Sequence, residues 1–369
     1  MKCSVKGDIP QNTQPRELQR RVTAHEVARF AGVSQSAVSR VFTPGASVSE
    51  QTRVKVVAAA TALRYRPNLI ASSLITGKSK IVGVVVPGLT NPFYAAIVDA
   101  LSESLSEQDY RVMLFTARYG TSADPILEEI LRYRLDALVL VSAQLSSRLA
   151  EDCADVGLPV VMVNRKTDSD AVSSVTGDNR AGAACIASFL VGGSHRCFAF
   201  MAGLDSSSTS RDREMGFVGR LYQEGVRSPL KVHGNYSVDD ASRATRGLLK
   251  AATRPDAIFC ANDLMAMAAI DVARSEFGLE VGRQISIVGF DDIQLAASAA
   301  FRLTTFSQPL DEMVGDTVSL LLDACNTRDR LAVSRIVTGQ LVVRESARLP
   351  QRGLSEVGGR TVWTQPASS

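Results

Sequence analysis

From Lys80 onward, short runs of β-branched and apolar residues alternate with helix-forming stretches, and this alternation constrains the fold more than any other feature. The apolar runs are Ile81–Val86, Val112–Phe115, Ala137–Val141, Val160–Val163, Cys197–Met201, Ala257–Cys260 and Ile285–Val288. The stretches between them that predict helices include Pro92–Gln108, Arg180–Leu190, Asp239–Ala251 and Leu264–Glu276. This alternation is typical of parallel sheets with crossover helices. The strands are too many for one compact sheet, so we predict two similar lobes.

The residues before this region differ from it in charge. Residues 1–80 hold 13 Lys and Arg against 4 Asp and Glu, whereas residues 81–369 hold 28 against 34. The net charge of +3 therefore combines a basic head with a mildly acidic body. Such a head indicates a module that binds a polyanion such as DNA, although a merely solvated basic surface would have the same composition.

A capping pattern begins the first helix that we predict in the head. Thr23 is followed three residues later by Glu26, the spacing at which the two residues can cap each other's backbone N–H groups. Val27, Ala28 and Phe30 would then give this short helix one apolar side.

A second helix is predicted after a glycine turn. Gly32 can adopt the positive φ of a sharp turn, and Ser34 can cap a helix that runs from Gln35 to Phe42. Val38 and Val41 would face inward and lock the second helix onto the first. Two short helices joined in this way predict a helix-turn-helix, whose second helix enters the major groove of DNA.

These motifs resemble those of the LacI/GalR (lac-repressor) family of bacterial transcription regulators. The resemblance is carried by Val-Thr-x-x-Glu-Val-Ala-x-x-Ala-Gly-Val-Ser-x-x-x-Val-Ser-Arg-Val at residues 22–41 and by Tyr65-x-Pro67-Asn68, and it continues to Arg348. It implies an N-terminal all-α helix-turn-helix head and an α/β periplasmic-binding-protein-like body of two doubly wound parallel-sheet lobes.

The resemblance also implies which side chains contact an operator in double-stranded DNA. Gln35, Ser36 and Arg40 would read base edges, and the two-pronged donor geometry of Arg40 suits a guanine. Further residues would hold phosphates or lie on the same outer face of the second helix. These are Thr23, Ser34, Ala37, Ser39 and Asn68.

Residues 68–77 resemble the hinge helix of the same family. A helix of this length is too short to be stable alone, so we expect it to fold only when two copies pack together over bent DNA. Leu74 would then wedge into the minor groove, and Ala71 is small enough for two hinge helices to touch. A plain interdomain linker is the alternative interpretation of these residues.

Polar and aromatic side chains follow the predicted strands of the body. Ligands bind beyond the carboxyl ends of the strands in open parallel sheets. The resemblance, which extends to periplasmic sugar-binding proteins, implies a cleft for a sugar or sugar-acid effector, whose hydroxyls or carboxylate would bind polar side chains while aromatic rings cover its C–H groups. The expected contacts are Asn91, Phe93, Tyr94, Arg213, Tyr236, Asn262, Asp291 and Gln308. Alternatively, Asn262 and Asp291 cap helices and Phe93 belongs to the core.

We therefore divide the chain into five parts. Residues 1–20 are predicted to be a disordered tail, 21–66 the helix-turn-helix domain, 67–78 the hinge helix or linker, 79–348 the two-lobed effector-binding and dimerisation domain, and 349–369 a flexible C-terminal tail. Because the tail lacks leucine heptads, we expect a homodimer, and its two-fold symmetry predicts a palindromic operator.

Two other classes of protein could share this body. A solute-binding protein for transport would need a signal peptide and no basic head, and this chain has the reverse. An enzyme would need a nucleophile–base set or a phosphate loop, but neither motif accompanies His25, His195 or His233. The six scattered cysteines suggest reduced thiols. We therefore expect a cytoplasmic, ligand-responsive repressor with no catalytic residues, cofactor, metal site or membrane partner.

Overall fold

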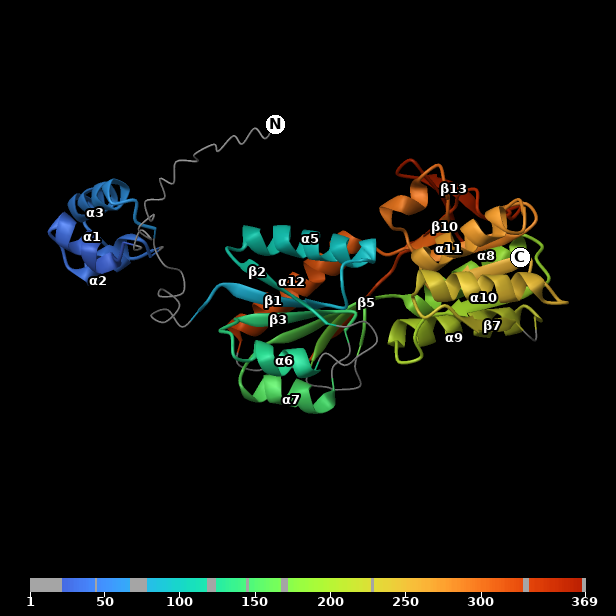
Figure 1. The fold of residues 1–369 in the computed structure, drawn as a ribbon, viewed down its shortest axis with the longest axis horizontal. Helices are drawn as coiled ribbons and strands as arrows, with labels where there is room; N and C mark the ends of the chain where they lie inside the picture. The colour runs from blue at the N-terminus through green and yellow to red at the C-terminus, as the bar shows by residue number, and fades with distance from the viewer. Residues whose placement is uncertain are drawn as a thin grey trace, which may run out of the picture. The chain divides into compact units, whose positions relative to one another are not determined.

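The structure is a computed structural model that describes residues 22–43, 45–66, 78–117, 124–143, 146–166, 172–226, 229–327 and 332–366. The chain divides into two compact units, residues 1–79 and 80–369 (Figure 1). The predicted tail at residues 1–20 and the predicted hinge residues Asn68, Ala71 and Leu74 lie outside the described residues.

The first unit contains the predicted helix-turn-helix and a third helix. These helices are α1 (Ala24–Ala31), α2 (Gln35–Val41) and α3 (Glu50–Ala62). The capping box of α1 is present, because the Thr23 hydroxyl accepts from the Glu26 N–H and the Glu26 carboxylate accepts from the Thr23 N–H at 2.8 Å. Gly32 ends α1 with a φ of 67°.

One expectation for the apolar side of α1 is wrong. Val27 and Ala28 are buried against α2 and α3, but Phe30 is 63% exposed. The side of α1 that packs on the other helices includes Ala24 and Ala31 together with Val27 and Ala28, and it turns Phe30 toward solvent.

The second unit begins with a lobe built on a six-stranded sheet, the first lobe. Its strand order is β11-β5-β4-β3-β1-β2, and all neighbours are parallel. Its strands are β1 (Ile81–Val86), β2 (Arg111–Thr116), β3 (Ala137–Val141), β4 (Val160–Val163), β5 (Ser173–Gly177) and β11 (Ser334–Val337). Helices cover both faces, with α5 (Pro92–Glu107) and α12 (Leu310–Asn326) on one and α6 (Asp124–Ile130) and α7 (Ser147–Asp155) on the other (Figure 1).

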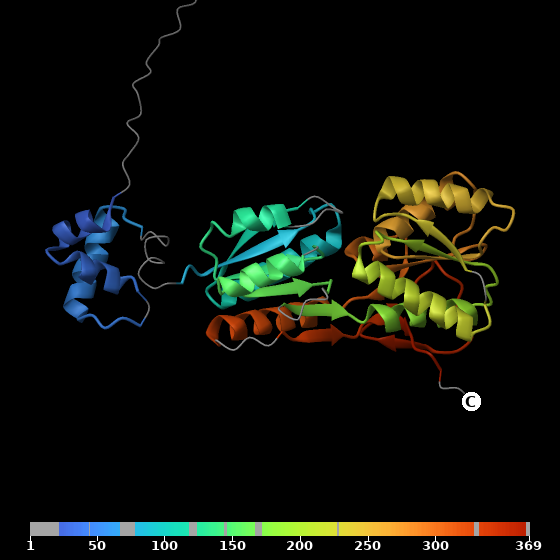
Figure 2. The same ribbon diagram turned by 90° about the horizontal axis from the view of Figure 1, so that it is seen from below.

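The second lobe is built on an eight-stranded sheet of order β13-β14-β12-β10-β9-β8-β6-β7. Its strands are β6 (Phe198–Ala202), β7 (Leu230–His233), β8 (Ala257–Cys260), β9 (Ser286–Asp291), β10 (Thr304–Ser307), β12 (Gln340–Val342), β13 (Leu354–Val357) and β14 (Arg360–Trp363). The sheet lies between the pair α8 (Asn179–Gly192) and α9 (Ser208–Gln223) and the pair α10 (Val238–Lys250) and α11 (Asp263–Ser275) (Figure 2). The short 3₁₀ helix η1 (Gln294–Ala297) follows β9.

The prediction of two parallel-sheet lobes is confirmed, with an antiparallel addition to the second sheet. The five strands from β7 to β10 in the sheet order are parallel, whereas β12, β14 and β13 continue it antiparallel. In the described part of the chain, no helix combines the length and the apolar character that crossing a bilayer requires.

The chain passes between the lobes three times, after β5, after β10 and between β11 and β12. Asp178 caps α8 at the first crossing, where its carboxylate accepts from the Ala181 N–H at 3.0 Å. At the third crossing, a Cβ on Gly339 would lie 1.8 Å from the carbonyl oxygen of Ser307. The crossing segments therefore lie closer together than any side chain at residue 339 would allow.

The prediction of a flexible tail after Arg348 is wrong for residues 354–363. They form the hairpin β13–β14, and β14 pairs with β12. Gly358 and Gly359 both have positive φ, as a two-residue hairpin turn between twisted strands requires. Val362 and Trp363 are each only 3% exposed, so burial of two apolar side chains stabilises a segment whose composition otherwise suggests disorder.

Candidate DNA-reading helix and interlobe site

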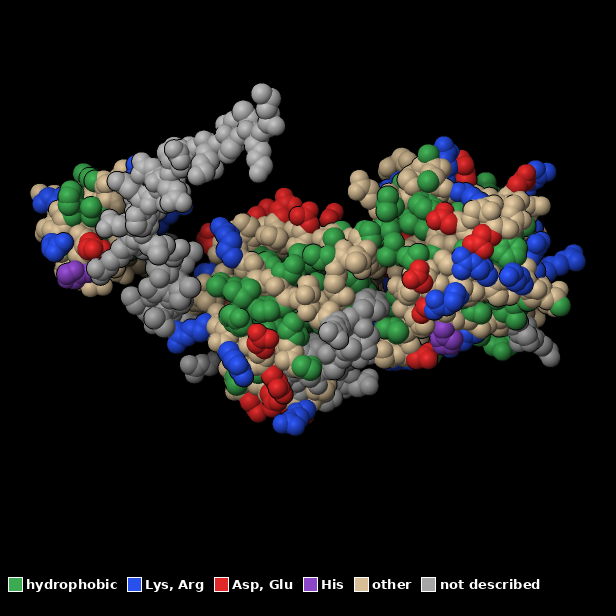
Figure 3. Space-filling view, viewed as in Figure 1, with side chains coloured by type: hydrophobic (Ala, Val, Ile, Leu, Met, Phe, Trp, Pro, Cys, Tyr) green, Lys and Arg blue, Asp and Glu red, His purple; other side chains and the backbone are tan. Residues whose placement is uncertain are grey.

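The outer face of α2 carries the side chains that we expect to read DNA. Ser34 caps the helix, since its hydroxyl accepts from the Ala37 N–H at 3.2 Å. Gln35, Ser36 and Arg40 are exposed, whereas Val38 is fully buried. Of the other residues of the head that we expect to contact DNA, Thr23 and Ser34 are exposed, and Ala37 and Ser39 are half-buried. Figure 3 shows Lys and Arg side chains on the visible face of this head.

In the second unit, polar side chains from both lobes converge on one small space, the interlobe site. Its lining residues are Asn91, Tyr94, Ser142, Asn164 and Arg165 from the first lobe and Ser207, Thr209, Arg213, Tyr236, Asn262 and Asp291 from the second. The void among them is about 10 Å³, about the space that one water molecule needs. A sugar-sized ligand therefore requires these side chains, or the lobes that carry them, to move apart.

Arg213 lines the interlobe site and is only 2% exposed. Its Nε donates to Asn179 Oδ1 at 2.8 Å, and its Nη1 donates to the carbonyl of Ala261. Its Nη2 lies 3.4 Å from Asp291 Oδ1, and the guanidinium stacks 3.7 Å above the ring of Phe290. Hydrogen bonds, an ion pair and a cation–π contact thus fix this buried charge in one position.

Asp291 ends β9 beside Arg213. Its carboxylate accepts from Gln308 Nε2 at 2.8 Å. Burial raises the pKa of Asp291 to about 6, although the Arg213 guanidinium opposes the rise. Burial also raises the pKa of Asp263, whose carboxylate accepts from the Thr305 hydroxyl at 2.6 Å and the Ile293 N–H at 2.9 Å.

Several expected effector contacts also have structural roles. Asn91 caps α5 through a 3.0 Å bond from the Phe93 N–H, and Asn262 caps α11 through a 3.1 Å bond from the Met265 N–H. Both still line the interlobe site, so the capping and binding interpretations are compatible. The Tyr236 hydroxyl also lines it, 3.4 Å from both Ser207 Oγ and Thr209 Oγ1.

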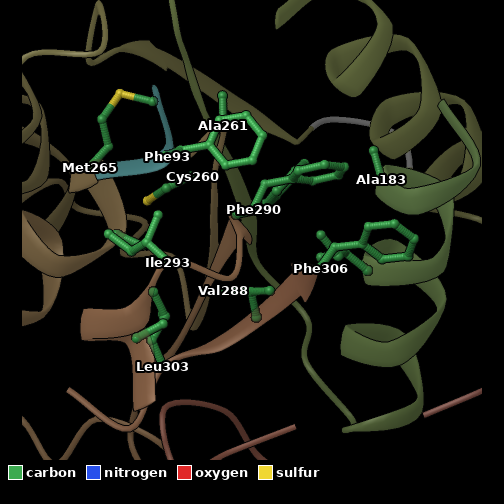
Figure 4. Packing of buried hydrophobic residues seen from close by; sticks show 14 of the residues in the cluster. Phe93, Ala183, Cys260, Ala261, Met265, Val288, Phe290, Ile293, Leu303 and Phe306 are labelled. Atoms are coloured by element: carbon green, nitrogen blue, oxygen red, sulfur yellow. The ribbon is translucent and has the colours of Figure 1, made fainter. Parts of the chain in front are cut away.

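Two of the expected contacts do not line the site. Phe93 is 4% exposed and belongs to the main buried cluster with Cys260 and Met265 of the second lobe (Figure 4). Gln308 is 7% exposed and holds Asp291 from behind, close to Gly177. The structure thus places Phe93 in the core and Gln308 one layer behind the lining.

The structure adds five lining residues that the sequence analysis missed, namely Ser142, Asn164, Arg165, Ser207 and Thr209. Ser142 and Asn164 directly follow β3 and β4, have φ values of 50° and 57°, and are joined by a 2.9 Å bond from Asn164 Nδ2 to Ser142 Oγ. Their position just after predicted strands is the signal that could have identified them. Beside them, Lys166 Nζ lies 2.9 Å from Asp212 Oδ2 of the second lobe.

The chemistry of the interlobe site is recognition of a polar molecule. Amide, hydroxyl, guanidinium and carboxylate groups surround it, and two tyrosine rings border it. The described residues contain no group of three or more His, Cys, Asp or Glu side chains that could hold a metal ion.

A three-helix DNA-reading head and a two-lobed, polar sensing body in one chain define a ligand-responsive transcription regulator. The pattern described as "Bacterial regulatory proteins, lacI family" matches residues 23–68. The pattern described as "Periplasmic binding proteins and sugar binding domain of LacI family" matches residues 79–341. The chain belongs to the LacI family of bacterial transcription regulators.

Relatives that match most of the chain agree with this assignment. The transcriptional regulator CelR of Thermobifida fusca is 31% identical over 89% of this chain and 99% of its own length. Catabolite control protein A of Priestia megaterium is 29% identical over 83% of this chain and 93% of its own length.

Solved structures are also similar to this chain. The lac repressor dimer bound to operator and the anti-inducer ONPF is 27% identical, with a TM-score of 0.80, over 89% of this chain and 99% of that one. The CelR–cellobiose complex is 30% identical, with a TM-score of 0.67, over 89% of this chain and all of that one.

Proposed function

We propose that this regulator is a repressor that binds a palindromic operator as a dimer and responds to a sugar or sugar acid in the interlobe site. The observation that carries the proposal is the union in one chain of an outward-facing reading helix and a polar site between two lobes. A two-fold dimer presents two reading helices, and these match two inverted half-sites. Acting on a bacterial operator, the protein would work in the cytoplasm.

The similar proteins support the dimer and the repressor role. The lac repressor structure is a dimer on its operator, and a relative from Photobacterium profundum with 28% identity is a transcriptional repressor, PurR. The effector class is supported by the lining, because Asn91, Asn262 and Asp291 offer donors and acceptors to hydroxyls while Tyr94 and Tyr236 supply rings. The similar CelR structure holds cellobiose.

The proposed switch is a shift between two arrangements of the lobes. Because the void in the interlobe site is about 10 Å³, a bound sugar would favour an arrangement with a wider site. The lobes would move about their three crossings, and the first lobes of the two protomers would turn against each other. Residues 67–78, as the hinge, would pass this movement to the heads.

Selection of duplexes from a random pool by the full-length protein tests the DNA half of the proposal. We expect the selected sequences to contain an inverted repeat. Binding to the best duplex is then measured with D-glucose, cellobiose, D-gluconate, D-glucuronate and D-galacturonate, each first screened for an increase in melting temperature. A compound that raises the melting temperature should also change operator affinity. Selected sequences without inverted symmetry, or operator affinity that no sugar changes, would contradict the proposal.

A further inference from the structure

Two consecutive residues at the end of β9 have positive φ values, which residues other than glycine rarely adopt. Asp291 has a φ of 119° and Asp292 a φ of 55°. Such conformations persist where surrounding contacts enforce them, and they concentrate at functional sites. Here the turn directs the Asp291 carboxylate to Gln308 and Arg213 in the interlobe site.

The contacts that hold this turn act on Asp292, whose side chain is 7% exposed. Its Oδ1 accepts from Arg344 Nη2 at 2.8 Å, and its Oδ2 accepts from Arg360 Nη1 at 3.1 Å. Arg344 is itself fixed by a 2.7 Å bond to the carbonyl of Leu303. Arg344 and Arg360 therefore each bind one oxygen of the Asp292 carboxylate. We call this arrangement the two-arginine grip.

Arg360 is the first residue of β14, and the hairpin that carries it is firmly attached. Val343 N–H donates to the carbonyl of Thr361 at 2.8 Å. Trp363 packs edge-on against Phe189, with ring centroids 5.7 Å apart, and its indole N–H donates to the carbonyl of Arg352 at 2.8 Å. The family match to the body ends at residue 341, so this hairpin and both arginines lie beyond it.

We propose that Arg360 is a positioning residue for the interlobe site. From the C-terminal hairpin it holds the Asp291–Asp292 turn in the strained conformation that presents Asp291 to Arg213. The hairpin thereby becomes part of the effector-sensing machinery. The effect on the turn stands on the contacts above, whereas the effect on effector affinity rests on the proposed function.

Hydrogen–deuterium exchange of the full-length, sugar-free protein tests the grip. In Arg360→Gln, we expect the peptide spanning residues 286–297 to exchange about two- to fivefold faster, the size expected for loss of one partly exposed ion pair. Arg360→Lys should restore slow exchange in part, because it keeps the charge. The matched control is Arg352→Gln, which makes the same charge change in a segment where the Arg352 backbone carbonyl holds Trp363.

Sugar titration tests the link to the site. Any of the five compounds above that raises the melting temperature of the wild type is titrated into Arg360→Gln and into the control Arg352→Gln. We expect about two- to fivefold weaker binding in Arg360→Gln alone, with sugar-free operator affinity unchanged. Exchange in residues 286–297 that equals the wild type would overturn the grip, and faster exchange with unchanged sugar affinity would overturn the link to the site. If no sugar binds the wild type, the proposed effector class fails while the exchange result still decides the grip.

Discussion

Arg40 is the residue on which base reading by α2 depends most. It is exposed beside the buried Val38 and carries the planar donor pair that matches guanine. We expect Arg40→Ala to weaken binding to the selected operator by about 1–3 kcal/mol and to relax one base position. Fluorescence anisotropy against the operator and its single-base variants measures both effects. The control Arg29→Ala removes an exposed charge near the end of α1, and full discrimination in Arg40→Ala would contradict the base-reading role.

His195 makes the stability of the body depend on pH. Its side chain is fully buried, and Nδ1 accepts a 2.6 Å bond from Arg348. Burial, and then the charge of Arg348, lower the pKa of His195 to about 4, against about 6.5 in an unfolded chain. As the pH falls, the unfolded chain therefore takes up the proton first. The contribution of the buried, neutral His195 to the free energy of unfolding is therefore complete above pH 6.5 and is lost as the pH falls toward 4.

The expected contribution of His195 is a loss of roughly 3 kcal/mol in the free energy of unfolding between pH 7.5 and 4, read as the difference between the wild type and His195→Gln. The raised pKa values of Asp291 and Asp263 act in the opposite direction, and they do so equally in both proteins. Urea unfolding at a series of pH values measures this difference, with fluorescence of the single tryptophan, Trp363, as the signal. His195→Gln should remove this contribution from the profile, whereas His233→Gln, at a side chain that is 44% exposed, should leave the profile unchanged. Equal slopes in the wild type and His195→Gln would disprove the assignment.

At the scale of elements, the start of α1 depends on its capping box. Thr23→Ala removes the hydroxyl that accepts from the Glu26 N–H, so we expect it to destabilise the head by about 1 kcal/mol. Amide exchange within α1 reports this loss directly. Thr61→Ala is the matched control, because the Thr61 hydroxyl only bonds to the Val57 carbonyl one turn back in α3. Equal exchange in the two variants would rule out a stabilising cap.

Strands made of apolar residues could be predicted from the sequence. Polar strands, whose burial depends on hydrogen bonds to distant residues, could not. The strands β1, β3, β4 and β8 are apolar, and the sequence predicts them at their observed bounds. The sequence analysis does not predict the polar strands β5 and β10, because their burial depends on hydrogen bonds between their hydroxyls and residues far away in the sequence. Ser174 Oγ lies 3.1 Å from Ser334 Oγ, and Thr305 bonds to Asp263. No periodicity in β5 or β10 reveals such pairs.

The same limit applies to the interlobe site. Six of the eight expected effector contacts line it, because the ends of parallel strands meet at one edge of each sheet. The sequence does not predict how deeply a side chain lies. Phe93 and Gln308 come shortly after strands that end at the site, but both side chains lie behind the residues that line it. The arrangement of the whole body decides which residues of the second lobe line the site together with Ser142 and Asn164. No local sequence pattern reveals these residues.

At the scale of the whole body, an ion pair between Lys166 and Asp212 is one of the contacts that join the lobes besides the three crossings. Lys166 Nζ lies 2.9 Å from Asp212 Oδ2, and the Lys166 N–H donates to Ser208 Oγ at 3.4 Å. Because the Lys166 side chain is 54% exposed, we expect this pair to contribute only about 0.2–1 kcal/mol to the close arrangement of the lobes. That contribution is still enough to shift a balanced equilibrium between closed and open lobes.

Lys166→Gln and Asp212→Asn should therefore each increase the radius of gyration of the sugar-free protein in small-angle X-ray scattering. The double variant should add little to either, because the two side chains share one interaction. High salt should increase the radius of the wild type and leave the double variant unchanged, since screening weakens an exposed pair. Arg283→Gln, which breaks an exposed pair within the second lobe, is the control. Additive effects of the two substitutions would show that Lys166 and Asp212 act separately, and would overturn the role of this ion pair in holding the lobes together.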